Sequence, residues 1–152
     1  MSLSNVRVFK VRPTAKLPHR AHSTDAGMDL FYCPQDETEL IIDPSCTALL
    51  QTGVKVEVPN TCMLQVMNKS GVASKKQLLA GACVVDEGYT GEIFVNLHNV
   101  GSTPQTVVPG QKIAQAVFVK IEKPLLVEIQ TDEIYDSQTS RGSGALGSTG
   151  EV

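Results

Sequence analysis

Val54-Lys55-Val56-Glu57-Val58 places a β-branched apolar side chain at every second position. This period of two is typical of a β-strand, in which successive side chains point to opposite faces. A second stretch, Val6-Arg7-Val8-Phe9-Lys10-Val11, alternates in the same way. Both stretches therefore predict half-buried strands with one apolar and one polar face.

Short runs rich in strand-forming residues continue along the chain, at residues 61–67, 82–85, 92–97, 113–121 and 125–129. Residues that favour turns separate these runs, as in Asp43-Pro44 and Pro109-Gly110. Only residues 71–77 have a helical pattern. Many short strands at close spacing predict an all-β protein, a jelly-roll-like barrel or sandwich with one short helix.

The composition is that of one soluble globular domain, because the 152 residues are 41% hydrophobic and 19% charged. The net charge of −3 argues against a non-specific binder of nucleic acid or of membrane surfaces, since either partner favours a basic face. No apolar run approaches the roughly 18 residues that a membrane-spanning helix needs. The four cysteines lack the spacing of a zinc site, so we expect reduced thiols in a cytoplasmic protein.

The composition changes near residue 130. From 131 to 152 the chain is polar and rich in glycine, and such a segment buries too little apolar surface to order itself. We therefore expect a β domain over residues 1–130 and a flexible C-terminal arm over residues 131–152. Because Arg141 lies among glycines and hydroxyls, the arm is either an inert terminus or a loop that wraps phosphate. The residues alone leave both interpretations open.

Five short segments lie in order along the chain: Ala26-Gly27-Met28-Asp29-Leu30, Lys69-Ser70-Gly71-Val72-Ala73, residues 81–91, residues 109–115 and residues 141–150. Together they resemble the five motifs of the trimeric dUTPase family, and the resemblance runs over nearly the whole chain. It implies a homotrimeric jelly-roll enzyme that hydrolyses dUTP to dUMP and pyrophosphate with Mg²⁺. That reaction limits uracil incorporation into DNA and supplies dUMP for thymidylate synthesis.

The third segment is, by this resemblance, a β-hairpin that selects the nucleoside. The backbone of Ala82, Cys83 and Val84 would pair with the edge of uracil, and cytosine would leave buried groups unpaired there. Tyr89 matches the tyrosine that packs under the deoxyribose, where a ribose 2′-hydroxyl would collide. Asp86 matches the general base, which activates the water that attacks the α-phosphorus in line.

The first, second and fourth segments resemble the part of the family site that holds the triphosphate and Mg²⁺. Ser70 and Gly71 match the pair that binds the α/β bridge, and Gln115 matches a glutamine near the phosphates. Asp29 matches the aspartate that supports the water shell of the metal or the local structure, with Mg²⁺ held mainly by the triphosphate. Lys69 stands where the family usually has arginine, and lysine lacks the planar two-pronged contact of a guanidinium.

The fifth segment resembles an arm that closes over the nucleotide. Arg141 matches the arginine that clamps the γ-phosphate, and Ser148 and Thr149 are expected to add hydrogen-bond donors. Leu146 stands where the family has a phenylalanine that stacks on uracil, so the chain loses that ring-on-base contact. In the family one subunit supplies the phosphate segments, a second the hairpin and a third the arm.

Three alternative functions remain open at this point. A dUTP-binding sensor of the same fold would bind dUTP without turnover, and the changed residues Lys69 and Leu146 fit relaxed catalysis. A relative of dCTP deaminase would need a different water-activating set beside cytosine. A structural jelly roll with an inert tail is disfavoured by five motifs in the right order. We expect no nucleic-acid or membrane partner.

Overall fold

The protein is described by a computed structural model that covers residues 5–135, 137, 139–140 and 142–143. These residues form eleven strands and one helix. The elements are β1 (Val8–Lys10), β2 (Met28–Phe31), β3 (Leu40–Ile42), β4 (Thr47–Gln51), β5 (Val54–Val56), β6 (Cys62–Met67), α1 (Ser70–Lys76), β7 (Leu78–Ala80), β8 (Val84–Val85), β9 (Phe94–Asn99), β10 (Gln105–Val107) and β11 (Lys112–Lys120).

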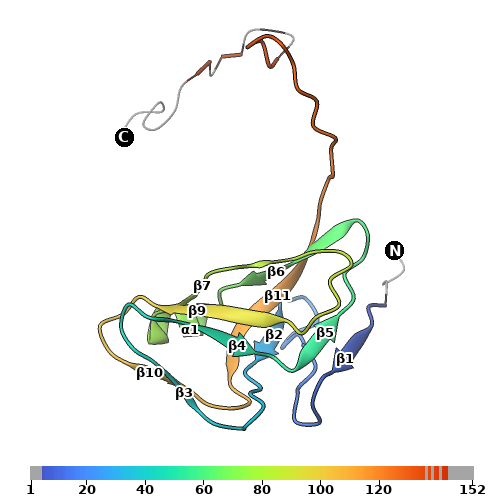
Figure 1. Cartoon of the computed structure of the whole chain (residues 1–152). Helices are drawn as coiled ribbons and strands as arrows, with labels where there is room; N and C mark the ends of the chain where they lie inside the picture. Colours follow the sequence, from blue (N-terminus) through green and yellow to red (C-terminus); the bar gives the residue numbers. More distant parts are fainter. Residues whose placement is uncertain (1–4, 136, 138, 141, 144–152) are drawn as a thin grey trace. The chain divides into compact units, whose positions relative to one another are not determined.

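The strands pair in four small antiparallel sheets, which confirms the predicted all-β fold of jelly-roll type (Figure 1). The largest sheet has the order β2-β11-β6-β8, and a second has the order β4-β9-β7. The ribbons β1-β5 and β10-β3 complete the arrangement. One core joins the two larger sheets, because Leu30 and Leu64 from the first pack in the same buried cluster as Leu50 and Leu97 from the second.

The two alternating stretches located β1 and β5, and the short β-rich runs located β6, β8, β9 and β11. The short helix also lies where the sequence predicts it. Other strands were missed because they do not alternate. In β2 the residues Asp29, Leu30 and Phe31 are all buried. In β4 the burial alternates but the residue types do not, because the exposed Leu49 and the buried Leu50 are both apolar. The strand predicted at residues 125–129 is wrong: the segment pairs with no strand in the described structure, and Leu125 and Leu126 are fully exposed.

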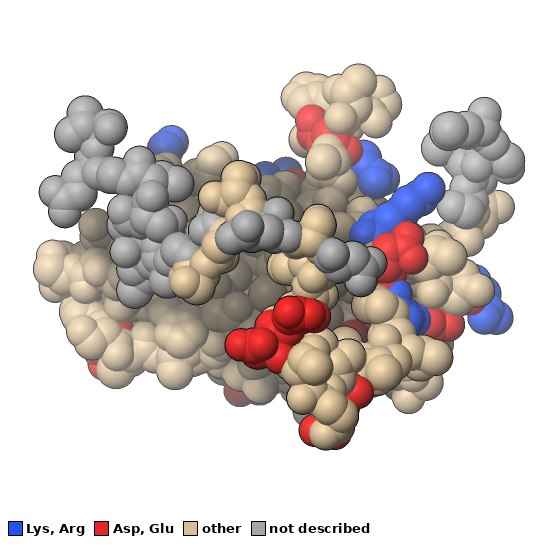
Figure 2. All heavy atoms as spheres, turned by 90° about the horizontal axis from the view of Figure 1, so that it is seen from above, with Lys and Arg blue, Asp and Glu red and all other residues tan. Residues whose placement is uncertain are grey.

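The chain divides into two compact units, residues 1–122 and 123–152. All the strands and the helix lie in the first unit. Acidic and basic side chains are interspersed on the face shown in Figure 2, and no broad basic patch covers the described part of it. Among the described residues, no helix is long and apolar enough to cross a bilayer.

Asn99 is a buried polar residue at the end of β9, with 1% of its surface exposed. Its Nδ2 donates to the carbonyls of Ile42 and Thr103, each at 2.8 Å, and its Oδ1 accepts from the Gly101 N–H at 2.9 Å. The side chain therefore satisfies three backbone groups, one buried at Ile42 and two part-buried, and it ties β3 to the loop after β9.

Replacing Asn99 by alanine should lower the free energy of unfolding by about 2–4 kcal/mol, because buried backbone groups then lack partners. Urea unfolding measures the change. The matched control is Gln105→Ala, which removes a side-chain bond to Thr103 near the surface and should change stability by less than about 0.5 kcal/mol. Equal losses in the two variants would contradict this role of Asn99.

Candidate functional site

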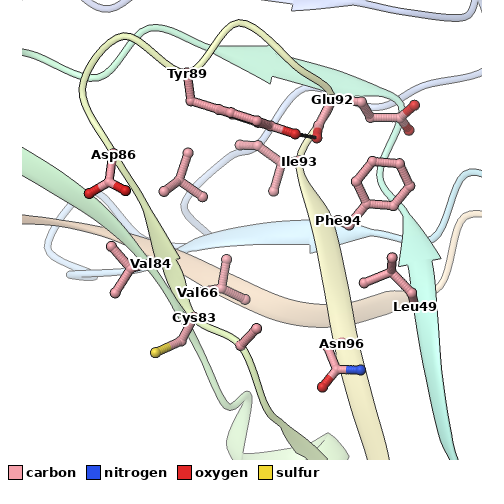
Figure 3. Close-up of a pocket in the computed structure, with 12 residues that line it drawn as sticks. Leu49, Val66, Cys83, Val84, Asp86, Tyr89, Glu92, Ile93, Phe94 and Asn96 are labelled. Atoms are coloured by element: carbon pink, nitrogen blue, oxygen red, sulfur yellow. Dashed lines mark hydrogen bonds between the residues drawn. The ribbon is translucent and has the colours of Figure 1, made fainter.

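A cavity of the first unit, of about 480 Å³, lies between the hairpin segment that contains β8 and the start of β9 (Figure 3). This volume falls in the range of small-molecule sites. Its lining includes the predicted residues Ala82, Cys83, Val84, Asp86 and Tyr89. The structure thus brings together all five residues that the third motif predicted for the nucleoside and the attacking water.

The hairpin segment pairs with the sheet over only two residues, because β8 is that short. These two residues pair with Leu64 and Gln65 of β6. The Cys83 carbonyl accepts the Val66 N–H at 2.7 Å, so this end of the segment is fixed to β6. Beyond Val85 the chain turns, and Asp86 is exposed on the cavity wall. The geometry leaves the Asp86 carboxylate accessible to a water molecule.

Tyr89 lies across the open end of the cavity, with its ring spanning from the hairpin to the start of β9 (Figure 3). Its hydroxyl donates to the Glu92 carbonyl at 2.9 Å. A Cβ at position 91 would collide with the Tyr89 ring, so Gly91 is needed for this packing. Tyr89 as a whole remains 48% exposed, and it therefore offers an apolar surface to a ligand.

A second cluster joins the first, second and fourth motifs. The buried Asp29 lies 2.7 Å from the Nζ of Lys69 through Oδ1 and 2.6 Å from the Nζ of Lys112 through Oδ2. The second contact is an ion pair without an oriented hydrogen bond. Burial raises the pKa of the Asp29 carboxyl, but Lys112 and Lys69 lower it by more, so the pKa lies below its usual value. Two lysines and one carboxylate give the cluster a net charge of +1, and both lysines are half-exposed.

Gln115 connects the same three motifs through packing. Its Nε2 donates to the carbonyl of Asn68, the residue before Lys69, at 2.9 Å. A Cβ at position 27 would collide with the Gln115 side chain, so Gly27 permits the approach of β2 and β11 at this point. Ser70 and Gly71 begin α1, where backbone N–H groups have no partner within the helix.

Some lining residues were not predicted from the sequence. Glu92, Phe94 and Leu49 contribute to the cavity, and Lys112 pairs with Asp29. Glu92 and Lys112 lie beside or inside the recognised motifs, whereas Leu49 has no local signal. Four predicted site residues lie outside the described residues: Arg141, Leu146, Ser148 and Thr149.

The described residues contain no group of three or more His, Cys, Asp or Glu side chains placed to hold a metal ion. Both carboxylate oxygens of Asp29 contact lysine. The protein side chains therefore fit a divalent cation only if the ion takes most of its ligands from a bound molecule and from water, as Mg²⁺ does with nucleotides.

The sequence matches the family model for dUTPase over residues 13–150. A deoxyuridine 5′-triphosphate nucleotidohydrolase of Alkaliphilus metalliredigens is 40% identical, with 96% of this chain and 97% of the relative covered. The enzyme of the same name from fowlpox virus is 35% identical, with 97% and 99% covered.

Solved structures that are similar to this chain are also dUTPases. A mutant dUTPase of Staphylococcus bacteriophage 80alpha with dUpNHpp superposes with a TM-score of 0.83 at 25% identity, over 97% of this chain and 99% of that one. A mutant dUTPase of phage phi11 of S. aureus, described with a structural Mg(II) ion, has a TM-score of 0.77 at 25% identity, over 86% and 100%.

Replacing Asp29 by asparagine should lower the free energy of unfolding at pH 7 by about 1–3 kcal/mol, because two lysines lose a buried counter-charge. The pKa of Asp29 is lower in the folded chain than its unfolded value of about 3.9, so this stabilisation is present above that pH and is lost as the pH falls below it.

Urea unfolding of both proteins at pH 7, 5 and 3 measures the effect, and the gap between them should shrink at pH 3. The exposed Asp43 supplies the control, Asp43→Asn, which should leave stability within about 0.5 kcal/mol. A gap that persists unchanged at pH 3 would mean that the loss comes from packing and not from charge.

Proposed function

This chain belongs to the dUTPase family, and we propose that it hydrolyses dUTP to dUMP and pyrophosphate. It is then a nucleoside triphosphate pyrophosphohydrolase, which keeps uracil out of DNA and supplies dUMP for thymidylate synthesis. The observation that carries the proposal is the cavity that Ala82, Cys83, Val84, Asp86 and Tyr89 line together, in a chain that matches the family over residues 13–150.

The cavity wall suits recognition of uracil by the backbone. Uracil presents one donor, N3–H, between two carbonyl acceptors, whereas cytosine replaces one acceptor by an amino donor. Because Cys83 is fixed to β6 through Val66, the hairpin backbone is unable to rearrange cheaply for the wrong pattern. An unpaired buried group then disfavours cytosine strongly.

The chemistry requires one proton acceptor and a held phosphate chain. Asp86 would accept a proton from a water molecule as the water oxygen bonds to the α-phosphorus. The bond from the α-phosphorus to the α/β bridging oxygen breaks in line, and pyrophosphate leaves with that electron pair. A carboxylate is a weak base at neutral pH, so positioning and charge compensation supply most of the acceleration.

The triphosphate would be held by the second cluster and by α1. We assign Lys69, Ser70, Gly71 and Gln115 to the phosphates, on the basis of their convergence around Asp29. The triphosphate would hold most of the coordination sphere of Mg²⁺, and the ion would offset negative charge on the phosphate oxygens. The ion pairs of Asp29 support a role in local structure, and a role in the water shell of the metal stays a prediction.

The residues beyond 130 complete the proposed site. We propose that residues 1–130 form the β domain and that residues 131–152 form an arm that closes over the nucleotide. Arg141, Ser148 and Thr149 would contact the phosphates, and Leu146 would cover uracil. These assignments rest on the fifth motif alone.

The strand register supports a site shared between subunits of a homotrimer. Val85 pairs with Leu64, so the next residue, Asp86, lies at the level of the start of β6. Ser70 follows the opposite end of β6, beyond Met67. Four extended residues separate these levels by at least about 13 Å. The base and the phosphate ligands of one nucleotide must act on adjacent atoms, so we propose that they come from different chains.

Replacing Asp86 by asparagine should lower kcat for dUTP at least about a hundredfold, because the shape is kept and the base is lost. The affinity for a non-hydrolysable dUTP analogue should change little. Pyrophosphate release and calorimetry measure the two quantities, with Asp43→Asn as the control. Near-normal turnover would remove Asp86 from the mechanism.

Two defective variants should rescue each other if the sites are shared. Asp86→Ala lacks the base in every site, and a chain that ends at residue 136 lacks the arm in every site. Mixed trimers made by co-expression would contain sites with an intact hairpin and an intact arm from different chains. Activity above the sum of the parents supports sharing; activity at that sum, with mixed trimers demonstrated by mass, contradicts it.

A further inference from the structure

Arg12 and Glu92 form a two-pronged ion pair that is almost closed to solvent. The Nη1 and Nη2 atoms of Arg12 lie 2.8 and 2.7 Å from the two carboxylate oxygens of Glu92. The two side chains are only 14% and 11% exposed. An ion pair at this depth has strict geometric demands, because each charge loses its water and depends on its partner.

Both members of the pair also bind the backbone of other elements. Arg12 Nη1 donates to the Cys33 carbonyl at 3.0 Å, just after β2. The Gly53 N–H donates to Glu92 Oε1 at 2.7 Å, between β4 and β5. Gly53 has a φ of +72°, and a Cβ there would lie 2.6 Å from the Cβ of Ala15. The Glu92 carboxylate is therefore anchored to two loops of the barrel at once.

The backbone of Glu92 carries the contact that matters for the nucleoside site. Its carbonyl accepts the Tyr89 hydroxyl at 2.9 Å, and the next residue, Ile93, donates its N–H to the Val54 carbonyl at 2.9 Å. Figure 3 shows the Tyr89 ring reaching from the hairpin to this carbonyl, while the Glu92 carboxylate points away from the gap. Tyr89 itself is 48% exposed, so core packing alone does not fix its ring.

We propose that Arg12 is a positioning residue of the nucleotide site, which acts through Glu92 to fix the Tyr89 ring and so sets the discrimination between deoxyribose and ribose. The proposal rests on the proposed function, in which the sugar packs on Tyr89. A wall excludes one extra hydroxyl only if it is unable to move aside by a fraction of an ångström. A ring tethered to a mobile carbonyl would tilt and admit the 2′-hydroxyl.

A purely structural role for the ion pair makes a different prediction. If Arg12 and Glu92 only stabilise the barrel, their loss lowers the melting temperature and leaves the preference for dUTP over UTP unchanged in the folded protein. The ratio of the kcat/KM values for the two nucleotides therefore separates positioning from stability.

The experiment compares Arg12→Lys with a matched control, Arg7→Lys. Arg7 also makes a two-pronged contact with Glu57, through Nε and Nη2 at 2.9 and 3.0 Å, but this pair is exposed and lies just beyond the paired residues of β1 and β5. Pyrophosphate release from dUTP and from UTP is measured as kcat and KM separately, together with the melting temperature. Arg12→Lys should lower the dUTP/UTP ratio at least about fivefold, mainly through KM. Arg7→Lys should leave the ratio unchanged, and an unchanged ratio in folded Arg12→Lys overturns the proposal.

A second variant keeps the test decisive if Arg12→Lys fails to fold. Tyr89→Phe retains the ring and the buried ion pair and removes only the bond to the Glu92 carbonyl. It should lower the same ratio, and the double variant should lose no more than the larger single loss, because both changes break one connection. An unchanged ratio in Tyr89→Phe, or losses that add in the double variant, overturns the proposal.

Failure of the proposed function has a separate signature. If the wild-type protein releases no pyrophosphate from dUTP, the proposed function fails. The same ratio is then measured as the Kd values of non-hydrolysable dUTP and UTP analogues. A lower ratio for Arg12→Lys still supports the positioning role, and an equal ratio overturns it.

Discussion

The site depends on the antiparallel pairing of β6 with β11 on one side and β8 on the other. Through β11, strand β6 is linked to β2, which brings Asp29 opposite Gln115 and Gln115 opposite Met67. Through β8, the same strand holds the hairpin that leads to Asp86. Because β8 runs antiparallel to β6, the chain moves away from the helix that follows β6 as it passes from Val84 to Val85. One register therefore builds the cavity beside β8 and the cluster around Asp29, and also keeps the two apart within a chain. That separation is the physical reason to expect a shared site.

Two carboxylates with little exposure, Asp29 and Glu92, organise the lysine cluster and the cavity respectively. They do so in different ways. Asp29 has two lysine partners that are themselves half-exposed, so its cluster presents positive charge outward. Glu92 has one arginine partner that is nearly buried, so its pair presents no charge to the cavity and fixes the backbone instead. A phosphate chain needs cations, whereas a neutral base and sugar need shaped walls. The positions of the ion pairs match this division of the proposed ligand.

The sequence predicted the strands and turns that local patterns encode. It missed the strands and the ion pair that depend on tertiary contacts. The alternation at Val54–Val56 marks a strand because one face is buried and the other is wet. No such pattern marks β2, because tertiary pairing buries Asp29 beside Leu30 and Phe31. The third motif identified residues that line one cavity, since a turn and its flanks are local in sequence, and the roles of these residues stay a prediction. Arg12 is 80 residues from Glu92, and nothing near either residue signals the pair. Residues 125–129 have strand-forming side chains, but a strand also needs a partner, and the described structure offers none.

Lys69, too, depends on a tertiary contact for its position. A lysine in place of the usual arginine loses a planar, preorganised fork and gains a flexible four-carbon stem. The contact of its Nζ with Asp29 Oδ1 at 2.7 Å restores a fixed position for the charge. Asp29 is held in turn by Lys112, and its carboxylate stays ionised because both cations lower its pKa. In the proposed site, a three-residue cluster would replace the directionality of one guanidinium, with a buried anion that orients two point charges. We expect this arrangement to keep the field that a triphosphate needs, with looser control over the angle at which each phosphate oxygen approaches.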